Sequence, residues 1–331
     1  MRLHKLRRMA TLIGLAIGLG AMAGPIGAQT APPQYHVVQE IRLGGEGRWD
    51  YVAVDTARNR LFIARQTRVM VVDEKSGKVL GEIPNIDGAH GVALDYADGH
   101  GFATAGKSGT VTMFDLATLQ VRGAHPAGDG ADAILYDPAS RQVFSFNGHA
   151  HTSSVLDPRS GESIATIPLD GKPEFGVSAG DGRVFVNIED RSEMVQIDAK
   201  ARKVARHWAL DPCVEPTGLA FDTVHQRLFS VCSNQLMAIS DAKSGKVIGT
   251  VPIGARVDGA GFDPETQLAF ASNGEGSLTV VHEDAPSHFR RVATVPTHEG
   301  ARTMALDLRT HRIFTITMVS DSFALLVLDR H

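Results

Sequence analysis

The sequence predicts an all-β fold, a seven-bladed β-propeller with four-stranded antiparallel blades. Three observations support this prediction. Short strands recur about every 42 residues, turn-forming acidic residues occupy matching positions in the copies, and the chain contains one early strand-like segment that belongs to no copy. Strand patterns of this period are typical of propeller blades, whereas helical repeats would show a 3.6-residue periodicity.

The stretch from Glu215 to Pro252 shows the repeating unit most clearly. A tight turn over Asp241–Gly245 precedes its last strand, and Gly245 can adopt the positive φ that such a turn requires. A terminal proline, which cannot donate a hydrogen bond to a sheet, ends the unit. Its four predicted strands are Thr217–Asp222, Gln226–Cys232, Leu236–Ser240 and Lys246–Pro252.

The same unit occurs seven times. An acidic residue closes the first strand of six copies, and Ala179 takes this place in the fourth. These closing residues are Asp55, Asp95, Asp137, Asp222, Asp263 and Asp307. The acidic residue that ends the third strand recurs at intervals of 42, 42, 41, 43, 43 and 45 residues, at Asp73, Asp115, Asp157, Asp198, Asp241, Asp284 and Asp329.

The two ends of the repeat region predict how the ring closes. Only two residues follow Asp329, so the last copy lacks a fourth strand. Tyr35–Leu43 is strand-like and precedes the first copy. Pairing this segment with the last copy would complete the seventh blade and remove the exposed sheet edges of an open stack.

Residues 1–28 are predicted to be a cleaved signal peptide, 29–34 a linker, and 35–331 the propeller. Four basic residues precede an apolar stretch from Ala10 to Met22, and cleavage is expected after Ala23 or Ala28. The apolar stretch is shorter than the roughly 20 residues of a membrane-spanning helix. We therefore expect a periplasmic protein with no membrane span after cleavage.

The charge balance disfavours nucleic acid as a partner. The whole chain has a formal charge of −4, and removal of the four basic residues of the signal segment takes this to −8. Binding to a phosphate backbone requires clustered Lys and Arg. We expect a monomer that binds a protein or a small polar ligand.

The two cysteines, Cys213 and Cys232, precede the first strand and end the second strand of the fifth copy. Antiparallel pairing places these two positions side by side, within the reach of a disulfide. An oxidising compartment favours the bond, and two buried thiols are the alternative.

Several phrases of the sequence resemble the bacterial YVTN family of β-propeller repeat proteins. They include Gly91–Asp95 followed by Gly101–Thr104, and also Val195–Asp198. Ser76–Pro84 and the similar segment Ser244–Pro252 belong to the same set. The resemblance covers residues 35–331 and implies a periplasmic or surface seven-bladed propeller. It implies no catalytic residues.

A ring of polar residues is predicted at one mouth of the central channel. The first strand of each blade lines this channel, so the residues five positions before each closing position should meet at one end. We call them the mouth ring: Asp50, His90, Asp132, Glu174, Thr217, Asp258 and Arg302. Glu215 could take the place of Thr217. Carboxylates gathered there would raise one another's pKa unless a cation offsets them.

Oxygen ligands with one imidazole suit Ca²⁺, Mg²⁺ or Mn²⁺, so the mouth ring is a candidate site for a divalent cation or a polar ligand. The alternative is a solvated channel that binds nothing. The loops between second and third strands open at the same mouth and add Arg65 and Asn273 as candidate ligand-binding residues. Trp49 could form an apolar wall or pack between blades.

His149 and His151 are candidate metal ligands. Alternate residues of an extended segment point the same way, so the two imidazoles could bind Zn²⁺ or Cu²⁺ with a third ligand such as His90 or Asp132. Solvent-exposed histidines without a metal are the alternative.

Two function classes follow. The first is a binding or scaffold propeller that holds a partner or a small polar ligand at the acidic mouth. The second is a Mg²⁺- or Ca²⁺-dependent lyase or lactone hydrolase. Streptogramin lyases are similar in architecture and use a mouth histidine, a glutamate and Mg²⁺, which implies His90 with Glu174 or Glu215. This second class is an analogy of fold, because no sequence motif of those enzymes is present.

Overall fold

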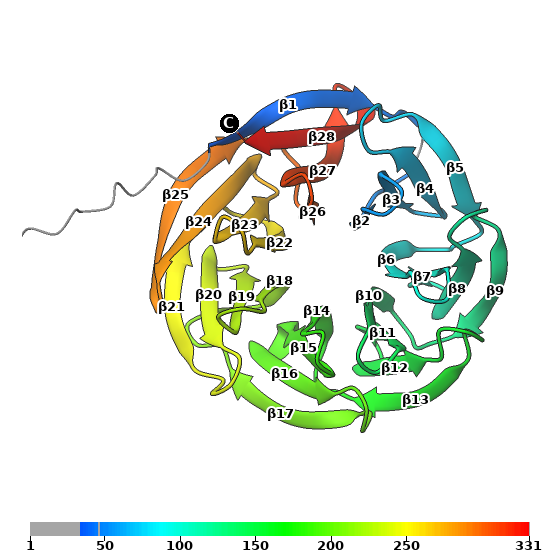
Figure 1. Ribbon diagram of the computed structural model, residues 1–331, viewed down its shortest axis with the longest axis horizontal. Coiled ribbons are helices and arrows are strands. Elements are labelled where there is room, and N and C mark those ends of the chain that lie inside the picture. Colours follow the sequence, from blue (N-terminus) through cyan, green and yellow to red (C-terminus); the bar gives the residue numbers. More distant parts are fainter. Residues whose placement is uncertain (1–33, 46, 331) are drawn as a thin grey trace, which may run out of the picture. The chain divides into compact units, whose positions relative to one another are not determined.

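The computed structural model describes residues 34–45 and 47–330. This part of the chain forms seven four-stranded antiparallel sheets around a central axis (Figure 1). The predicted seven-bladed β-propeller is therefore confirmed. The predicted signal segment, 1–28, and residues 29–33 of the linker lie outside the described residues.

Six blades consist of four consecutive strands, of which the first lies nearest the axis (Figure 1). Blades one to three contain β2 (Val52–Asp55), β3 (Arg60–Arg65), β4 (Arg68–Asp73), β5 (Val79–Pro84), β6 (Ala89–Asp95), β7 (His100–Ala105), β8 (Thr110–Asp115), β9 (Val121–Pro126), β10 (Ala131–Asp137), β11 (Gln142–Asn147), β12 (Thr152–Leu156) and β13 (Ser163–Pro168). Blades four to six contain β14 (Pro173–Ser178), β15 (Arg183–Ile188), β16 (Glu193–Asp198), β17 (Lys203–Ala209), β18 (Pro216–Asp222), β19 (Arg227–Cys232), β20 (Leu236–Asp241), β21 (Val247–Pro252), β22 (Val257–Asp263), β23 (Leu268–Asn273), β24 (Ser277–Ala285) and β25 (His288–Pro296).

The seventh blade joins the two ends of the ring, as the sequence predicts. It contains β26 (Met304–Asp307), β27 (Arg312–Val319) and β28 (Ser322–Arg330), and its outer strand is β1 (Tyr35–Arg42). The register of β1 against β28 runs from Tyr35 opposite Arg330 to Arg42 opposite Ala324. The Tyr35 hydroxyl also donates a hydrogen bond to the carbonyl of His311, at 2.9 Å.

The closing aspartates of the first strands shape the following turns. All six are buried, and their carboxylates accept hydrogen bonds from backbone N–H groups two or three residues later, as in Asp55 with Arg58 and Asp222 with Val224. This is the geometry of an Asx turn. In the fourth blade the Ser178 hydroxyl replaces the missing carboxylate and accepts a hydrogen bond from the N–H of Gly180.

The hydrophobic core is divided into seven layers, one in each junction between neighbouring blades. The third residue of the second strand in every blade is a buried phenylalanine, and these are Phe62, Phe102, Phe144, Phe185, Phe229, Phe270 and Phe314. Burial of each ring is worth about 1.5–3 kcal/mol. Each blade therefore depends on both of its neighbours for stability.

Cys213 and Cys232 form the predicted disulfide, with their Cα atoms 5.5 Å apart. Both residues are buried in the layer between blades four and five. Within residues 34–45 and 47–330, none of the helical segments has the length and hydropathy of a membrane-spanning helix.

Removal of the Tyr35 side chain should weaken ring closure. Its ring packs edge-on against Phe270, with centroids 5.0 Å apart, and only 5% of the residue is exposed. Tyr35→Ala is expected to lower the free energy of unfolding by about 3–5 kcal/mol, measured by urea denaturation. Val38→Ala, in the same strand but exposed, should cost less than about 0.5 kcal/mol. Equal losses in the two variants would contradict the closure role.

The disulfide closes a short loop of 19 residues' separation. The Cys213→Ala, Cys232→Ala double variant is expected to lose about 3 kcal/mol of unfolding free energy, because the unfolded chain gains conformational freedom. Reductant should lower the unfolding free energy of the unmodified protein by a similar amount and leave that of the variant unchanged. A protein whose stability does not respond to reductant would argue against this bond.

Candidate functional site

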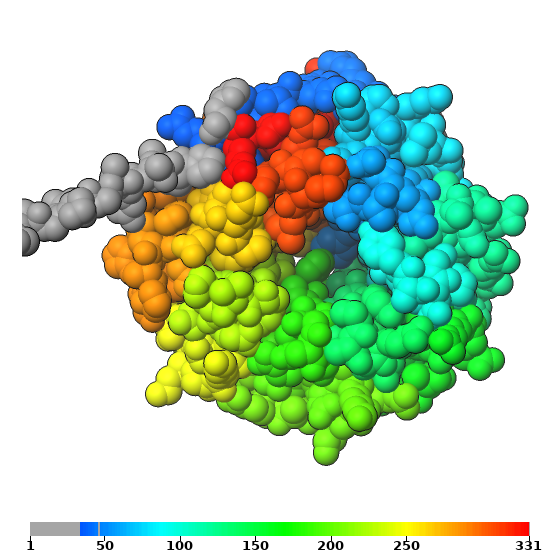
Figure 2. All heavy atoms as spheres, viewed as in Figure 1, coloured from blue at the N-terminus to red at the C-terminus, as the bar shows by residue number. Residues whose placement is uncertain are grey.

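The innermost strands bring most of the mouth ring together. Each residue lies at or just before the start of the first strand of its blade, so neighbouring blades place their ring residues side by side. The space-filling view shows a hollow at the centre of the seven blades (Figure 2). Close-range ion pairs or hydrogen bonds connect Asp50, His90 and Asp132 on one side of the hollow, and Asp258 with Arg302 on another.

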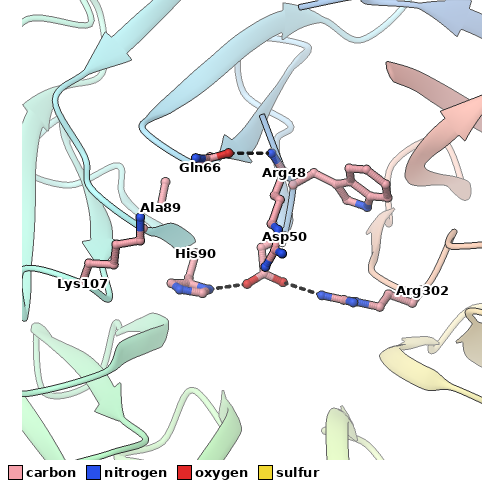
Figure 3. Close-up of a pocket in the computed structure, with 9 residues that line it drawn as sticks. Arg48, Asp50, Gln66, Ala89, His90, Lys107 and Arg302 are labelled. Atoms are coloured by element: carbon pink, nitrogen blue, oxygen red, sulfur yellow. Dashed lines mark hydrogen bonds and ion pairs between the residues drawn. The ribbon is translucent and has the colours of Figure 1, made fainter. Parts of the chain in front are cut away.

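His90 lies between two carboxylates. Its Nδ1 atom makes a hydrogen-bond contact with Oδ2 of Asp50 (Figure 3). The same atom lies 3.4 Å from Oδ1 of Asp132. One oxygen or nitrogen atom from each of these three residues lies within 4.8 Å of the other two. The group therefore has the spacing needed to hold a metal ion.

Two permanent cations neutralise part of the ring. Nε of Arg302 lies 2.8 Å from Oδ2 of Asp258, and Nη2 of Arg302 lies 3.9 Å from Oδ1 of Asp50 (Figure 3). Nζ of Lys172 lies 3.4 Å from Oε2 of Glu174 and also pairs with Glu189. Asp132 has no such permanent partner among the described residues, and its Oδ1 atom is buried without a hydrogen bond.

Crowding and burial change the acidity of the ring. Burial, followed by the charge of Asp50, raises the pKa of Asp258 to about 7. The same two causes raise the pKa of Asp132, and burial with the charge of Asp132 raises that of Glu174. Burial alone would lower the pKa of His90, but its hydrogen bond to Asp50 and the charge of Asp132 raise it overall. His90 is thus biased towards the imidazolium form.

Tyr51 and Phe175 form a constriction beneath the ring that the sequence analysis did not predict. They follow Asp50 and Glu174 directly, and their rings meet from blades one and four with centroids 5.3 Å apart. Burial raises the pKa of Tyr51 well above its usual value, and the charges of Asp132 and Glu174 add to this. Comparison of the copies could have found the pair, because the matching positions in the other blades hold only Gly, Ala or Thr.

Two adjacent hollows open at the mouth. One has a volume of about 460 Å³ and is lined by Trp49, Asp50, His90 and Arg302, with Arg48 and Lys107 also on its wall (Figure 3). The other has a volume of about 520 Å³ and is lined by residues that include His90, Asp132 and Lys172. His90 and Lys107 contribute to both hollows.

Trp49 both packs between blades and forms a wall of the site, the two roles that the sequence left open. Its indole packs against Phe323, with ring centroids 5.7 Å apart, and it also lines the first hollow. Thr217 occupies its ring position but donates its hydroxyl to backbone carbonyls, including that of Val257 at 3.2 Å. Glu215 does not take its place, because the backbone turns at Glu215, with φ of 48°, and the carboxylate accepts a hydrogen bond from Ser233.

Arg65 and Asn273 are held inside the protein. The guanidinium of Arg65 is buried, lies over the ring of Phe323 and donates hydrogen bonds to loop carbonyls, among them those of Gly44 and Gly45. The amide of Asn273 is buried and donates to the hydroxyls of Ser277 and Thr279. Both side chains support the loops at the mouth and do not face the hollows.

His149 and His151 do not converge on a common point. The predicted extended segment is a turn in which His151 has φ of 54°, so the alternation that would align the two imidazoles is lost. His149 is exposed and lies 3.6 Å from the exposed carboxylate of Asp129. Among the described residues, neither histidine belongs to a group with metal-binding spacing.

Comparisons with known proteins show the fold and no family. No protein-family model matches this sequence, and no curated protein matches it either. Among solved structures, the chain is similar to the hydrazine synthase of Kuenenia stuttgartiensis, with a TM-score of 0.72 and 15% sequence identity. The alignment covers 84% of this chain and 94% of that chain. At this level of identity the similarity shows a shared propeller fold alone.

The raised pKa of Asp258 predicts that the protein becomes less stable between about pH 4 and pH 7. The unfolded chain releases this proton near pH 4, whereas the folded protein holds it until about pH 7. The folded state therefore binds more protons in this window, and the free energy of unfolding falls as the pH rises. Asp258→Asn should remove about 2–4 kcal/mol of this fall, measured by urea unfolding across the window. Asp87→Asn, at an exposed position, serves as the control, and an unchanged slope in Asp258→Asn would contradict the prediction.

Proposed function

We propose that this chain is an exported binding protein whose acidic mouth holds a small polar ligand. The ligand offers a positively charged or hydrogen-bond-donating group, either as a free molecule or as a basic side chain of a protein partner. The Asp132 carboxylate is the main evidence for this proposal. Its Oδ1 atom is buried without a hydrogen bond, and the nearby Nδ1 of His90 already makes a hydrogen-bond contact with Asp50. A buried carboxylate oxygen without a donor is costly, and a ligand donor would remove that cost.

The charge and shape of the mouth support the same kind of ligand. Within the mouth ring, the carboxyl groups of Asp50, Asp132, Glu174 and Asp258 outnumber the basic side chains of His90 and Arg302. Trp49 supplies an apolar wall, and Arg48 and Lys107 lie at the edge of the same hollow. A molecule with a cationic head and a small apolar or anionic remainder would complement this arrangement.

Export is supported by the sequence and by the disulfide. The basic and apolar start of the chain has the order of a signal peptide. The Cys213–Cys232 bond is typical of an oxidising compartment. We therefore propose a bacterial periplasm as its location and the YVTN type of repeat propellers, which its motifs resemble, as its family.

A second candidate function is a metal-dependent lyase or hydrolase. The spacing of Asp50, His90 and Asp132 favours it, because two carboxylates and an imidazole suit Mg²⁺ or Mn²⁺. Glu174 is paired with Lys172 and Glu215 lies away from the ring, so neither is part of this ligand set. As a metal ligand His90 must be neutral, so a bound ion would displace the proton that the flanking carboxylates favour.

A thermal-shift screen tests the proposal. The probes are polyamines, quaternary amines, amino acids, Mg²⁺, Ca²⁺ and Mn²⁺. At one hundred times its Kd, a ligand of the mouth should stabilise the protein by about 2.7 kcal/mol. Asp132→Asn should weaken that ligand at least tenfold, a loss of about 1.4 kcal/mol. Glu299→Gln, whose side chain is 76% exposed and lines neither hollow, is the control.

The outcomes separate the two candidates. A shift from an organic cation that depends on Asp132 supports the binding protein. A shift from a divalent cation alone that is lost in both Asp132→Asn and His90→Ala supports the metal-dependent candidate. If no probe shifts the unfolding midpoint, or if the shift survives in Asp132→Asn, the mouth is not the binding site.

A further inference from the structure

A second acidic cluster lies at the opposite end of the first strands, between blades five and six. Asp222 ends β18, His225 follows in the next turn, and Glu283 belongs to β24 of the neighbouring blade. Nδ1 of His225 lies 2.6 Å from Oδ2 of Asp222 and 3.8 Å from Oε2 of Glu283. These three ligand atoms lie within 4.8 Å of one another. We call this group the junction site.

Glu283 is buried without a hydrogen-bond donor. Its side chain is 4% exposed, and within the described residues neither carboxylate oxygen accepts a hydrogen bond. No cationic atom lies within hydrogen-bond distance of this carboxylate among the described residues. Nε of Arg227 lies 3.8 Å from Oε1 of Glu283, and Nη1 of Arg227 pairs with Asp241 at 2.6 Å. Asp222 beside it is fully buried as well. Two buried carboxylates that face each other in this way are stabilised by a bridging cation or by a proton that they share.

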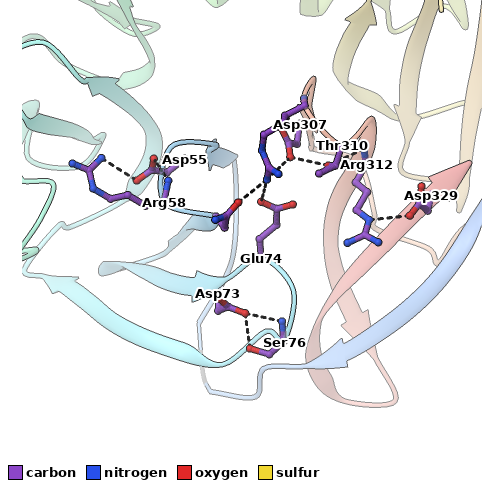
Figure 4. A network of polar contacts seen from close by, with 11 residues as sticks. Asp55, Arg58, Asp73, Glu74, Ser76, Asp307, Thr310, Arg312 and Asp329 are labelled. Atoms are coloured by element: carbon purple, nitrogen blue, oxygen red, sulfur yellow. Dashed lines mark hydrogen bonds and ion pairs between the residues drawn. The ribbon is translucent and has the colours of Figure 1, made fainter.

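The junction between blades seven and one shows what that cation does. Glu74 occupies the place of Glu283. The backbone N–H of Glu74 donates to the carbonyl of Asn59, just before β3, and that of Glu283 donates to the carbonyl of Gln267, just before β23. Asp307 occupies the place of Asp222. There Nη2 of Arg309 lies 3.2 Å from Asp307 and 3.5 Å from Glu74, so a guanidinium bridges the two carboxylates (Figure 4).

The turn after the closing aspartate differs between the two junctions, and where blade seven has Thr310, blade five has His225. Arg312 pairs with Asp329 in blade seven as Arg227 pairs with Asp241 in blade five, at 2.9 and 2.6 Å. Two residues after the closing aspartate, however, blade seven has Arg309 and blade five has Val224, which is 70% exposed. The position of Glu283 is Leu116, Ala199 or Ala242 in other blades, where there is no carboxylate pair to bridge.

We propose that Asp222, His225 and Glu283 form a zinc-type divalent metal site that replaces the missing guanidinium and joins blades five and six. Metal–ligand bonds of 2.0–2.2 Å in tetrahedral geometry put the ligand atoms about 3.4 Å apart. Nδ1 of His225 lies 2.6 Å from the Asp222 oxygen and 3.8 Å from the Glu283 oxygen, on either side of this value. One imidazole with two carboxylates suits Zn²⁺, whereas Ca²⁺ takes six to eight oxygens. His225 is 35% exposed, which opens the site to solvent and leaves a coordination position for water.

Titration with Co²⁺, a spectroscopic substitute for Zn²⁺, tests this site in the tag-free full chain. The measurements are made in an Asp132→Asn background, so that the mouth ring does not contribute. We expect one equivalent of Co²⁺ with a visible absorption band, displacement by Zn²⁺, and a rise of about 5 °C in the unfolding midpoint with Zn²⁺. Glu283→Gln should weaken the affinity at least tenfold.

The blade seven junction provides the control. Glu74→Gln alters the corresponding carboxylate pair but should leave Co²⁺ binding unchanged. His225→Ala, at a partly exposed position, should also lose the ion, and it keeps the test decisive if Glu283→Gln fails to fold. Absence of bound Co²⁺ in the Asp132→Asn protein, or equal binding by His225→Ala, would overturn the proposal.

Discussion

The pairing of β1 with β28 is the constraint on which the rest of the structure depends. It ties Tyr35 to Arg330 across almost the whole length of the described chain and turns seven sheets into a closed ring. Every apolar layer lies between two blades, so an open ring would expose the faces that meet between blades seven and one. Closure thus completes the hydrophobic core and at the same time pairs the edge of β28 that would otherwise be free.

Closure also forces the innermost strands together, and this produces the chemistry of the mouth. The backbones come so close that a Cβ atom at Gly91 would lie 2.9 Å from the carbonyl oxygen of Asp132, and one at Gly259 would lie 2.8 Å from the nitrogen of Met304. At this packing distance, side chains from blades far apart in the sequence share one small volume. Charges that would be independent on a surface are partly removed from water and perturb one another.

The same residue type has different roles at the two ends of these strands. The closing aspartates, such as Asp55, are buried but receive backbone hydrogen bonds, so they stabilise turns. The Oδ1 atom of Asp132 and the carboxylate of Glu283 are buried without enough donors from the described residues. The two groups differ in the source of their hydrogen-bond donors. A turn provides its own backbone N–H groups, whereas carboxylates in a channel wall or a blade junction depend on neighbouring side chains, a ligand or an ion.

The sequence by itself determined the blade number, the strand order and the closure, because these follow from local alternation, turn residues and a fixed period. It also placed Asp50, His90, Asp132 and Asp258 at one end of the channel, since equal offsets in equal repeats must meet around the axis. Only the tertiary structure decided which of them touch. The backbone turn at Glu215 sends its carboxylate to Ser233, Tyr51 reaches across to Phe175, and Glu283 of one blade faces Asp222 of the next. These contacts depend on side-chain direction and on packing between blades, which no local pattern encodes.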